Sequence, residues 1–220
     1  MWETKRLTLF SGHYGSGKTN IALNWAGMLK ARFDRVAVAD IDVVNPYFRS
    51  SDSRKALESQ GIRLICSPFA GSNVDLPALP GEVYALTDDR GLHAVIDIGG
   101  DERGALALGR WRDKILEEND YEMLLVVSFL RPLTRNSQDA LSVAREIESA
   151  CRMRFTGIVN NTNLGAETTA ELVLRSDQKA QELSRLMGIP LRMTCVDQAL
   201  LSALSGKIPN LFPLTLQERY

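Results

Sequence analysis

The chain has 220 residues, with 26 basic and 27 acidic side chains, 45% apolar residues and three cysteines. This length suits a single α/β domain that buries roughly 70% of its unfolded surface without disulfide bonds. A formal net charge of −1 argues against a protein that coats DNA or an anionic membrane. Cys66, Cys151 and Cys195 stand far apart in the sequence, which excludes a CxxC metal or redox motif and favours buried, reduced thiols.

The amino-terminal segment, Met1–Arg6, carries an acidic residue and lacks the apolar stretch of a signal peptide. The longest apolar run, Met123–Leu130, has about half the length that a membrane-spanning helix needs. We therefore expect a cytoplasmic protein.

Seven short apolar runs alternate with longer segments of helical character along the chain. Several runs are nearly continuous in Val, Ile and Leu, which is typical of strands that are covered on both faces. In the segments Asn136–Cys151 and Glu167–Met187 the apolar residues recur at helical spacing, as in helices that bury one face. The predicted strands are Leu7–Phe10, Val36–Ala39, Arg63–Cys66, Ala94–Ile98, Met123–Phe129, Phe155–Val159 and Leu191–Val196.

The alternation of strand and helix predicts an α/β fold with a single doubly wound, mostly parallel seven-stranded sheet and helices on both faces. No linker, charge block or repeat divides the chain, so we expect one domain over residues 1–220. The segment Ser67–Gly81 contains three prolines and is predicted to be a loop. The tail, residues 207–220, contains Pro209 and Pro213 and is expected to be irregular, because proline interrupts a helix. The predicted helices are Thr19–Ala31, Ser51–Gln60, Ala105–Glu118, Asn136–Cys151 and Glu167–Met187.

A phosphate-binding motif connects the first strand to the first helix. The run Gly12-His13-Tyr14-Gly15-Ser16-Gly17-Lys18-Thr19 matches the pattern GxxxxGK[ST] in this context. The glycines let successive N–H groups converge on an anion, and the helix N-terminus adds the positive end of its dipole. We expect Lys18 to contact the β- and γ-phosphates and the Thr19 hydroxyl to bind Mg²⁺. The predicted nucleotide-binding residues of this segment are Gly12, His13, Tyr14, Gly15, Ser16, Gly17, Lys18, Thr19 and Asn20.

Acidic residues stand at the ends of two predicted strands. Asp40 and Asp42 follow the predicted strand Val36–Ala39. Asp97 lies near the end of the fourth predicted strand, Ala94–Ile98. Parallel strands bring their carboxyl ends to one edge of the sheet, where α/β proteins bind ligands. Because Mg²⁺ and an attacking water need carboxylates at that edge, we predict a metal site there. The alternative role for such aspartates is helix capping. The predicted metal-site residues are Thr19, Asp40, Asp42 and Asp97.

The combination of these motifs resembles the MinD/ParA/CobQ-CobB group of SIMIBI-class P-loop nucleotide-binding proteins. An Asp-x-Asp pair follows the phosphate loop by about twenty residues, and a later strand ends in Asp-x-Gly-Gly. Gly157–Asn161 resembles the strand whose terminal Asn contacts adenine in this group, and Met187–Leu191 resembles the segment that enters its last core strand. Asp40–Pro46 is similar to a segment of the related bacterial tyrosine kinases. The resemblance extends from residue 5 to about residue 205.

The resemblance implies a role for each matching residue. Asp42 would orient the attacking water, Asp40 would hold Mg²⁺ through water, and Asp97 would lie just outside the ligands of the metal. Asn160 would pair with the edge of adenine, and the loop that contains Asp197 would close over the base. The predicted catalytic residues are Lys18 and Asp42.

The phosphate loop departs from the pattern of the group at His13. The group has a lysine there, which reaches the partner's phosphates across a nucleotide-sandwich dimer. An imidazole is shorter and is mostly neutral at pH 7. Our hypothesis is that His13 contacts a phosphate in place of this lysine, and the alternative is an unconstrained position of the motif. A nucleotide-dependent homodimer is therefore left open.

We expect a Mg²⁺-dependent ATP-binding protein, with slow ATP hydrolysis, that acts as a nucleotide switch on a protein client. ATP is favoured over GTP because the Asn-Lys-x-Asp guanine motif is absent. The alternative is an ATP-dependent small-molecule kinase, or a ligase similar to CobB and dethiobiotin synthetase, in which Arg49, Arg54 and Arg131 offer anion contacts. A nucleotide-binding subunit without hydrolysis is a third alternative.

Three specialised functions within the group fit the sequence less well. DNA partition would need a basic patch, but the basic residues near Arg110 are offset by neighbouring acidic residues. Membrane targeting would need a basic amphipathic helix, whereas the tail is apolar and interrupted by proline. An iron–sulfur scaffold would need paired cysteines. The expected partners are ATP or ADP and a protein client, without nucleic acid or membrane.

Overall fold

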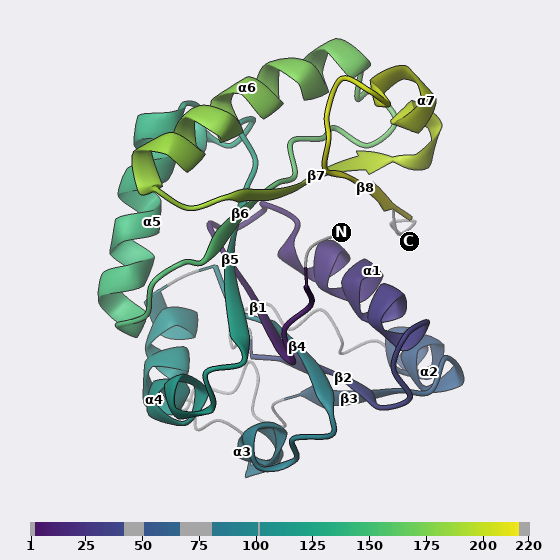
Figure 1. Cartoon of the computed structure of the whole chain (residues 1–220), viewed down its shortest axis with the longest axis vertical. Coiled ribbons are helices and arrows are strands. Elements are labelled where there is room, and N and C mark those ends of the chain that lie inside the picture. Colours follow the sequence, from purple (N-terminus) through teal and green to yellow (C-terminus); the bar gives the residue numbers. More distant parts are fainter. Residues whose placement is uncertain (1–2, 42–50, 67–80, 101, 216–220) are drawn as a thin grey trace.

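The computed structural model describes residues 3–41, 51–66, 81–100 and 102–215 of the chain. Within these residues, eight parallel strands form one sheet in the order β3-β2-β4-β1-β5-β6-β7-β8 (Figure 1). The strands are β1 (Leu7–Ser11), β2 (Val36–Asp40), β3 (Ile62–Cys66), β4 (His93–Asp97), β5 (Tyr121–Val127), β6 (Gly157–Asn160), β7 (Leu191–Asp197) and β8 (Leu211–Leu214). The helices are α1 (Lys18–Lys30), α2 (Ser51–Ser59), α3 (Gly81–Asp88), α4 (Glu102–Glu118), α5 (Ser137–Cys151), α6 (Ala170–Met187) and α7 (Leu201–Leu204), with short 3₁₀ helices η2 (Pro132–Thr134) and η3 (Gln198–Leu200).

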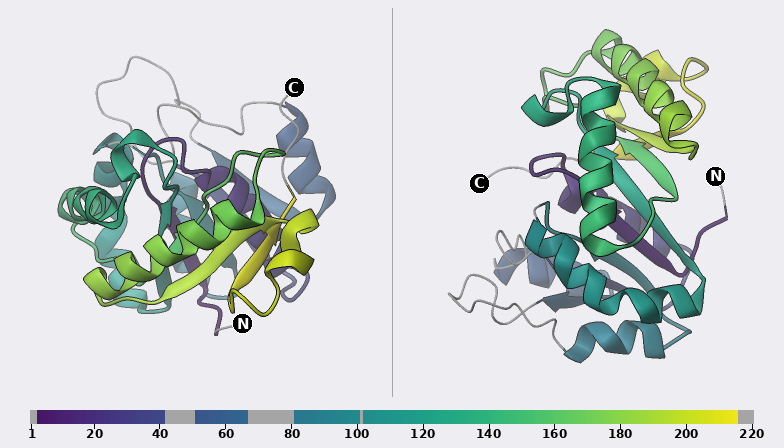
Figure 2. Two further views of the ribbon diagram at one scale, coloured as in Figure 1. Left: turned by 90° about the horizontal axis from the view of Figure 1, so that it is seen from above. Right: turned by 90° about the vertical axis from the view of Figure 1, so that its left-hand side faces the viewer.

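Helices cover both faces of the sheet, and the strand residues alternate between two cores. In β1, Leu7 and Leu9 belong to the core under α3, α4, α5 and α6, whereas Phe10 belongs to the core under α1 and α2. Figure 2 shows α4 and α5 in front of the sheet in its right-hand view. Burial on both faces explains why the central strands are nearly continuous in apolar residues.

Local signals in the sequence mark the ends of the long helices. The Asn136 side chain accepts a hydrogen bond from the Asp139 N–H at the start of α5, and Thr169 accepts one from the Leu172 N–H at the start of α6. Gly188 ends α6 in the left-handed conformation that glycine adopts without a steric penalty. These caps satisfy N–H and C=O groups that a helix leaves unpaired at its ends.

The structure confirms the parallel sheet with helices on both faces, and it contains all seven predicted strands and all five predicted helices. Each of these elements lies within a few residues of its predicted bounds. The helix α3 was not predicted, and it begins at Gly81, which closes the predicted loop Ser67–Gly81. The other residues of that loop lie outside the described ranges.

The tail differs from the prediction because it adds an eighth strand to the sheet. Strand β8 pairs in parallel with β7 at the edge of the sheet. Phe212 and Leu214 are buried in the core under α1, and Pro213 between them is exposed. An edge strand tolerates proline because its outward-facing N–H has no ladder partner to lose. The expectation of an irregular tail is therefore corrected for residues 211–214.

The end of β8 is bound to the helix that follows the phosphate loop. The Thr215 N–H donates to Asn24 Oδ1 at 2.9 Å, and Asn24 Nδ2 donates to the Thr215 carbonyl at 3.2 Å. Beside this pair, the Trp25 and Phe212 rings pack with their centroids 5.7 Å apart. Helix α1 follows β1, the first strand in the sequence, and it also contacts β8, the last strand in the sequence.

Candidate functional site

The phosphate loop runs from the end of β1 into α1, and its backbone requires glycine at two positions. Gly17 precedes the first turn of α1 with φ at 86°, in the left-handed region that side chains disfavour. A Cβ atom on Gly12 would lie 2.2 Å from the Val126 carbonyl oxygen, so β5 leaves room only for glycine there. The Ser16 N–H donates to the His13 carbonyl at 3.2 Å and closes the loop. The loop is therefore compact and folded back against the sheet.

Lys18 and Thr19 form the first turn of α1. Lys18 is buried, and its Nζ lies 3.4 Å from the His13 carbonyl oxygen inside the loop. The Thr19 hydroxyl donates to Asp97 Oδ2 at 2.5 Å. A hydroxyl that donates its only hydrogen in this way keeps its lone pairs for another ligand, such as a cation.

The carboxylates of Asp40 and Asp97 lie side by side at the carboxyl edge of the sheet. Asp40 ends β2 and Asp97 ends β4, and the parallel register pairs these two residues directly. Because Val38 and Val95 pack toward α1, the aspartates two positions later point to that same face. Asp40 is 2% exposed and Asp97 1% exposed, so both carboxylates are removed from water.

The donor set at this edge fits Mg²⁺. The Thr19 hydroxyl and the two carboxylates offer oxygen atoms only, which Mg²⁺ prefers to nitrogen or sulfur. Within the described residues there is no group of three or more His, Cys, Asp or Glu side chains that would hold an ion by itself. Mg²⁺ is bound in such sites by few protein ligands together with nucleotide phosphates and water, so this arrangement suits a metal that arrives with its nucleotide. Asp42, the remaining predicted metal residue, lies outside the described ranges.

Asn160 ends β6 but turns its side chain inward. It is fully buried, its Nδ2 donates to Ser176 Oγ at 2.9 Å, and its Oδ1 accepts from Thr162 Oγ1 at 2.8 Å. Both ends of the amide are therefore engaged within the protein. The amide keeps a second N–H and a second lone pair beyond these two bonds, and contact with adenine, as the resemblance implies, stays a prediction.

The other predicted residues lie at the same edge of the sheet. Asp197 ends β7, and its Oδ1 accepts from the Ala199 N–H at 2.8 Å. His13 Nδ1 lies 3.0 Å from the Tyr14 carbonyl oxygen, and the Tyr14 side chain is 62% exposed. Asn20 lies in the first turn of α1, where its carbonyl accepts from Asn24. A direct role in nucleotide binding stays a prediction for each of these residues.

Two side chains that follow β5 and β6 bind the carbonyls of the phosphate loop. Arg131 Nε donates to the Gly15 carbonyl at 2.7 Å, and Asn161 Nδ2 donates to the Ser16 carbonyl at 2.7 Å. Because N–H and C=O of a trans peptide point in opposite directions, the second bond turns the Gly17 N–H away from Asn161. From the sequence, Arg131 was expected only as an anion contact in the alternative function, and no role was predicted for Asn161. Their positions just after two predicted strands were the available signal.

The loop after β4 approaches the phosphate loop from the other side. A Cβ atom on Gly100 would lie 2.6 Å from the Tyr14 nitrogen and 2.9 Å from Lys18 Nζ. Real Cβ contacts essentially never reach such distances, so this approach requires glycine. The two loops are thus in direct contact where Lys18 lies.

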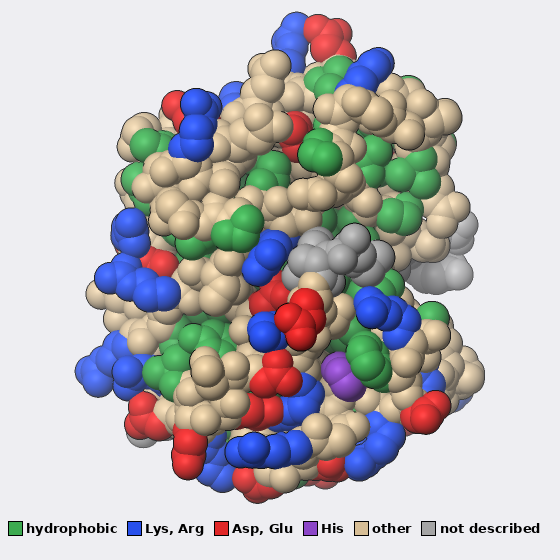
Figure 3. Space-filling model, viewed as in Figure 1, with side chains coloured by type: hydrophobic (Ala, Val, Ile, Leu, Met, Phe, Trp, Pro, Cys, Tyr) green, Lys and Arg blue, Asp and Glu red, His purple; other side chains and the backbone are tan. Residues whose placement is uncertain are grey.

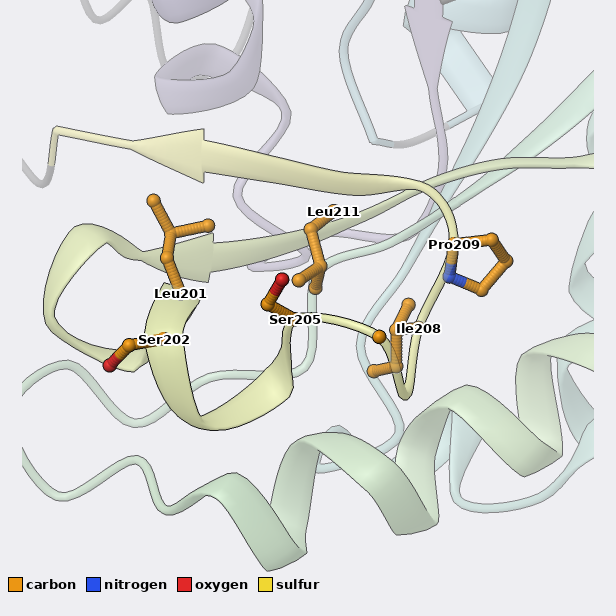
Figure 4. Close-up of a pocket in the computed structure, with 7 residues that line it drawn as sticks. Leu201, Ser202, Ser205, Ile208, Pro209 and Leu211 are labelled. Carbon is orange, nitrogen blue, oxygen red and sulfur yellow. The ribbon is translucent and has the colours of Figure 1, made fainter.

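A separate hollow of about 720 Å³ lies at α7 and the start of β8 (Figure 4). Its walls are apolar side chains and two serines, and none of the predicted site residues lines it. The lining residues are Leu201, Ser202, Ser205, Gly206, Ile208, Pro209 and Leu211.

The surface view in Figure 3 shows side chains of both charges. On the face in Figure 3, basic and acidic side chains are intermixed over the lower part of the molecule. In the described part of the chain, no helix is both long enough and apolar enough to cross a membrane.

Comparison with known proteins identifies the fold. No protein-family model matches the chain, and no curated protein matches it. Solved structures do match. The chain is 20% identical to the cell division protein FtsY of Thermotoga maritima, with a TM-score of 0.59 over 89% of this chain and 63% of that one. It is 18% identical to the signal recognition particle receptor FtsY of Elizabethkingia anophelis in complex with GDP, with a TM-score of 0.55 over 90% of this chain and 59% of that one. It is 15% identical to FtsY of Mycoplasma mycoides, with a TM-score of 0.55 over 89% of this chain and 61% of that one.

The likeness to FtsY is a likeness of fold, because the sequence identities are at most 20% in these structures. The chain spans about three fifths of the length of these proteins. This chain and these proteins therefore share a fold, and the assignment to the SIMIBI-class P-loop nucleotide-binding proteins stays a prediction. The narrower assignment to the MinD/ParA/CobQ-CobB group stays a prediction.

Proposed function

We propose that this chain is a Mg²⁺-dependent nucleotide switch that binds ATP and hydrolyses it slowly. The observation that carries the proposal is the hydrogen bond between Thr19 and Asp97, because it joins the phosphate loop to the carboxylates at the edge of the sheet. A phosphate loop alone binds an anion, whereas a hydroxyl held beside two carboxylates adds the ligands of a cation that accompanies phosphate.

Each residue at the edge has a defined task in this proposal. Backbone N–H groups of the loop and Lys18 would bind the phosphates. The Thr19 hydroxyl would hold Mg²⁺, with Asp40 and Asp97 accepting hydrogen bonds from its waters, and Asp42 would orient the attacking water. When bound, Mg²⁺ neutralises charge on the phosphates and favours transfer of the γ-phosphoryl group.

The contact between Gly100 and the phosphate loop supports the switch part of the proposal. The loop after β4 begins at Asp97, which binds Thr19, and reaches the Tyr14 backbone at Gly100. A ligand that rearranges Thr19 or Lys18 would therefore move this loop, as γ-phosphate contacts order the switch segments of other nucleotide-dependent proteins. A protein client would respond to that movement, and a nucleotide-dependent homodimer is one form that the response would take.

The base is proposed to be adenine because the sequence lacks the Asn-Lys-x-Asp motif for guanine. One of the structural neighbours was solved with GDP, so both bases belong in the test. Titration of the purified chain with ATP, GTP, ADP and GDP, with Mg²⁺ or with EDTA, measures the preference directly. We expect ATP to bind more tightly with Mg²⁺ than without it.

Three variants test the assignment of the site in the same titration. Lys18→Ala should abolish triphosphate binding, and Thr19→Ala should remove the effect of Mg²⁺ while leaving some affinity for the nucleotide. Lys207→Ala, an exposed lysine near the start of β8, is the matched control and should bind like the native chain. Native affinity in Lys18→Ala would overturn the proposed function.

The small-molecule kinase or ligase remains the second candidate from the sequence. Hydrolysis measured alone and then with panels of carboxylates, amines and alcohols separates the two functions. Slow turnover that ignores these additions supports the switch, whereas turnover that depends on one of them supports the kinase or ligase.

A further inference from the structure

Arg131 lies in a braced turn after β5. The Arg131 N–H donates to the Ser128 carbonyl at 3.2 Å, and the Thr134 N–H donates to the Arg131 carbonyl at 3.1 Å. Thr134 Oγ1 also donates to the Ser128 carbonyl, at 2.6 Å, and both of these residues are buried. The backbone that carries Arg131 is therefore fixed although its side chain is exposed.

The guanidinium of Arg131 lies against the phosphate loop at Gly15. Its Nε donates to the Gly15 carbonyl at 2.7 Å, and its Cζ lies 3.2 Å from the position that a Cβ atom of Gly15 would occupy. Gly15 has φ at 74°, so the loop presents bare backbone to the guanidinium at this point. Only one of the five N–H groups of Arg131 is used, and within the described residues the four on Nη1 and Nη2 have no recorded acceptor.

Among the described residues, few charged side chains lie at the phosphate loop. Lys18 is a buried cation, but Asp40 and Asp97 at the same edge are buried carboxylates. His13 brings its ring Nδ1 to within 3.0 Å of the Tyr14 carbonyl oxygen of its own loop. A nucleoside triphosphate carries several negative charges, and a guanidinium binds phosphate oxygens through two parallel hydrogen bonds.

We propose that Arg131 is a second cationic ligand of the nucleotide, held over the phosphate loop by the Gly15 carbonyl so that its terminal N–H groups bind phosphate oxygens. The inference rests on the proposed function, since it assigns a further residue to the same site. It places both cations of the site in one chain, with Lys18 inside the loop and Arg131 on its outer side.

The test compares Arg131→Met, Arg131→Lys and the control Arg135→Met for binding of ATP and GTP. Arg135 lies four residues further along the same segment, is exposed, and has no recorded side-chain contact within the described residues. We expect Arg131→Met to weaken triphosphate binding about tenfold to a hundredfold, as loss of a hydrogen bond between charged groups does. Arg131→Lys should recover part of the affinity, and Arg135→Met should match the native chain.

The dependence of affinity on salt separates a phosphate contact from a purely structural brace. Loss of an ionic contact makes binding less sensitive to salt, because screening then acts on fewer charge pairs. Asn161→Leu removes the other bond to the loop without changing charge, so it should weaken binding while keeping the native salt dependence. Thermal unfolding of each variant confirms that it is folded before binding is measured.

Three results would overturn the inference. The first is triphosphate binding by Arg131→Met as tight as that by Arg135→Met, the second is a native salt dependence in Arg131→Met, and the third is binding by Arg131→Lys no tighter than that by Arg131→Met. If instead the native chain binds no nucleotide, or Lys18→Ala binds normally, the proposed function itself fails.

Discussion

The Thr19 hydroxyl donates to Asp97 Oδ2 over 2.5 Å, and this bond joins the first turn of α1 to the end of β4. It exists because Asp97 points to the face of the sheet that α1 covers, next to Asp40 in register. The same turn of helix carries Lys18, and the loop that follows Asp97 contacts the phosphate loop at Gly100. One hydrogen bond thus lies where phosphate, metal and the loop after β4 would meet.

Asp97→Asn should reduce the effect of Mg²⁺ on nucleotide affinity. The amide keeps the size of the side chain and an oxygen that accepts from Thr19, but it removes the negative charge beside the metal position. Hydrogen bonds to charged groups contribute about 1.5–3 kcal/mol, so we expect the Mg²⁺-dependent gain in affinity to fall by about tenfold or more. Calorimetric titration with and without Mg²⁺ measures this gain.

Asp113→Asn is the matched control for that variant, because the Asp113 side chain is exposed on α4 and, among the described residues, pairs with the neighbouring Arg112. Its Mg²⁺ dependence should equal that of the native chain. An unchanged Mg²⁺ effect in Asp97→Asn would show that Asp97 has no part in holding the ion.

Gly100→Ala should displace the phosphate loop. The added Cβ atom would lie 2.6 Å from the Tyr14 nitrogen and 2.9 Å from Lys18 Nζ, so backbone as well as side chain must move. We expect nucleotide affinity to fall at least about tenfold, and the free energy of unfolding to fall by about 1–3 kcal/mol, as in other overpacked sites. Nucleotide titration and denaturant unfolding measure the two effects.

Gly27→Ala offers the opposite outcome within the same region. Gly27 lies in α1, and a Cβ atom there would meet nothing within 4 Å. Alanine should therefore stabilise the helix by about 0.5–1 kcal/mol and leave nucleotide affinity unchanged. If both glycine variants behaved alike, the contact between the two loops would have no importance for binding.

Asn24→Ala should loosen the end of β8. It removes both hydrogen bonds between the Asn24 side chain and Thr215, at the exposed side of α1. We expect faster hydrogen exchange at the Thr215 and Phe212 amides, with a loss of about 1 kcal/mol in the free energy of unfolding. Gln138→Ala on the exposed surface of α5 is the control, and it should leave these amides unchanged. Equal exchange in the two variants would mean that packing of Phe212 on Trp25 alone holds the strand.

Short-range patterns were sufficient to predict most of the fold. The phosphate loop, the seven core strands and the five longer helices each carry their signal within about ten to twenty residues, as apolar periodicity or as glycines at fixed spacing. Strand β8 lacked such a signal because it is short, contains Pro213 and closely follows Pro209, as a loop would. Its apolar residues gain their partner, Trp25, from nearly the other end of the chain.

The site residues that belong to a local sequence motif could be predicted. The contacts between segments that are distant in the sequence could not, because they depend on how the strands and helices pack. Thr19 was assigned to the site from the phosphate-loop motif and Asp97 from the end of its strand, and the structure brings the two side chains into contact. The bonds from Arg131 and Asn161 to the loop depend on which strands neighbour β1, which the sequence does not state. Asn160 shows the reverse case, because its position suited a base contact while its buried partners use both ends of the amide.

The stability of the fold should fall in mild acid because of His93. Its ring stacks on Phe33 with the centroids 3.6 Å apart, and burial, assisted by the nearby charge of Arg6, lowers the pKa of the imidazole below its usual value. The His93 imidazole is therefore protonated at a lower pH in the folded chain than in the unfolded chain, where its pKa is near 6.5. This contribution to stability is complete above about pH 6.5 and is lost as pH falls toward the lower pKa of the folded state.

Comparison with His93→Gln isolates this effect from the carboxylates. Burial raises the pKa of Glu148, but hydrogen bonds from the Phe155 N–H, Arg154 and Arg145 outweigh it and hold this pKa below its usual value, so the contribution of Glu148 is lost only in stronger acid. Denaturant unfolding at pH 7.5 and at pH 5.5 should show a larger decrease for the native chain than for His93→Gln. Equal decreases would show that the neutral imidazole at this position has no influence on the pH dependence of stability.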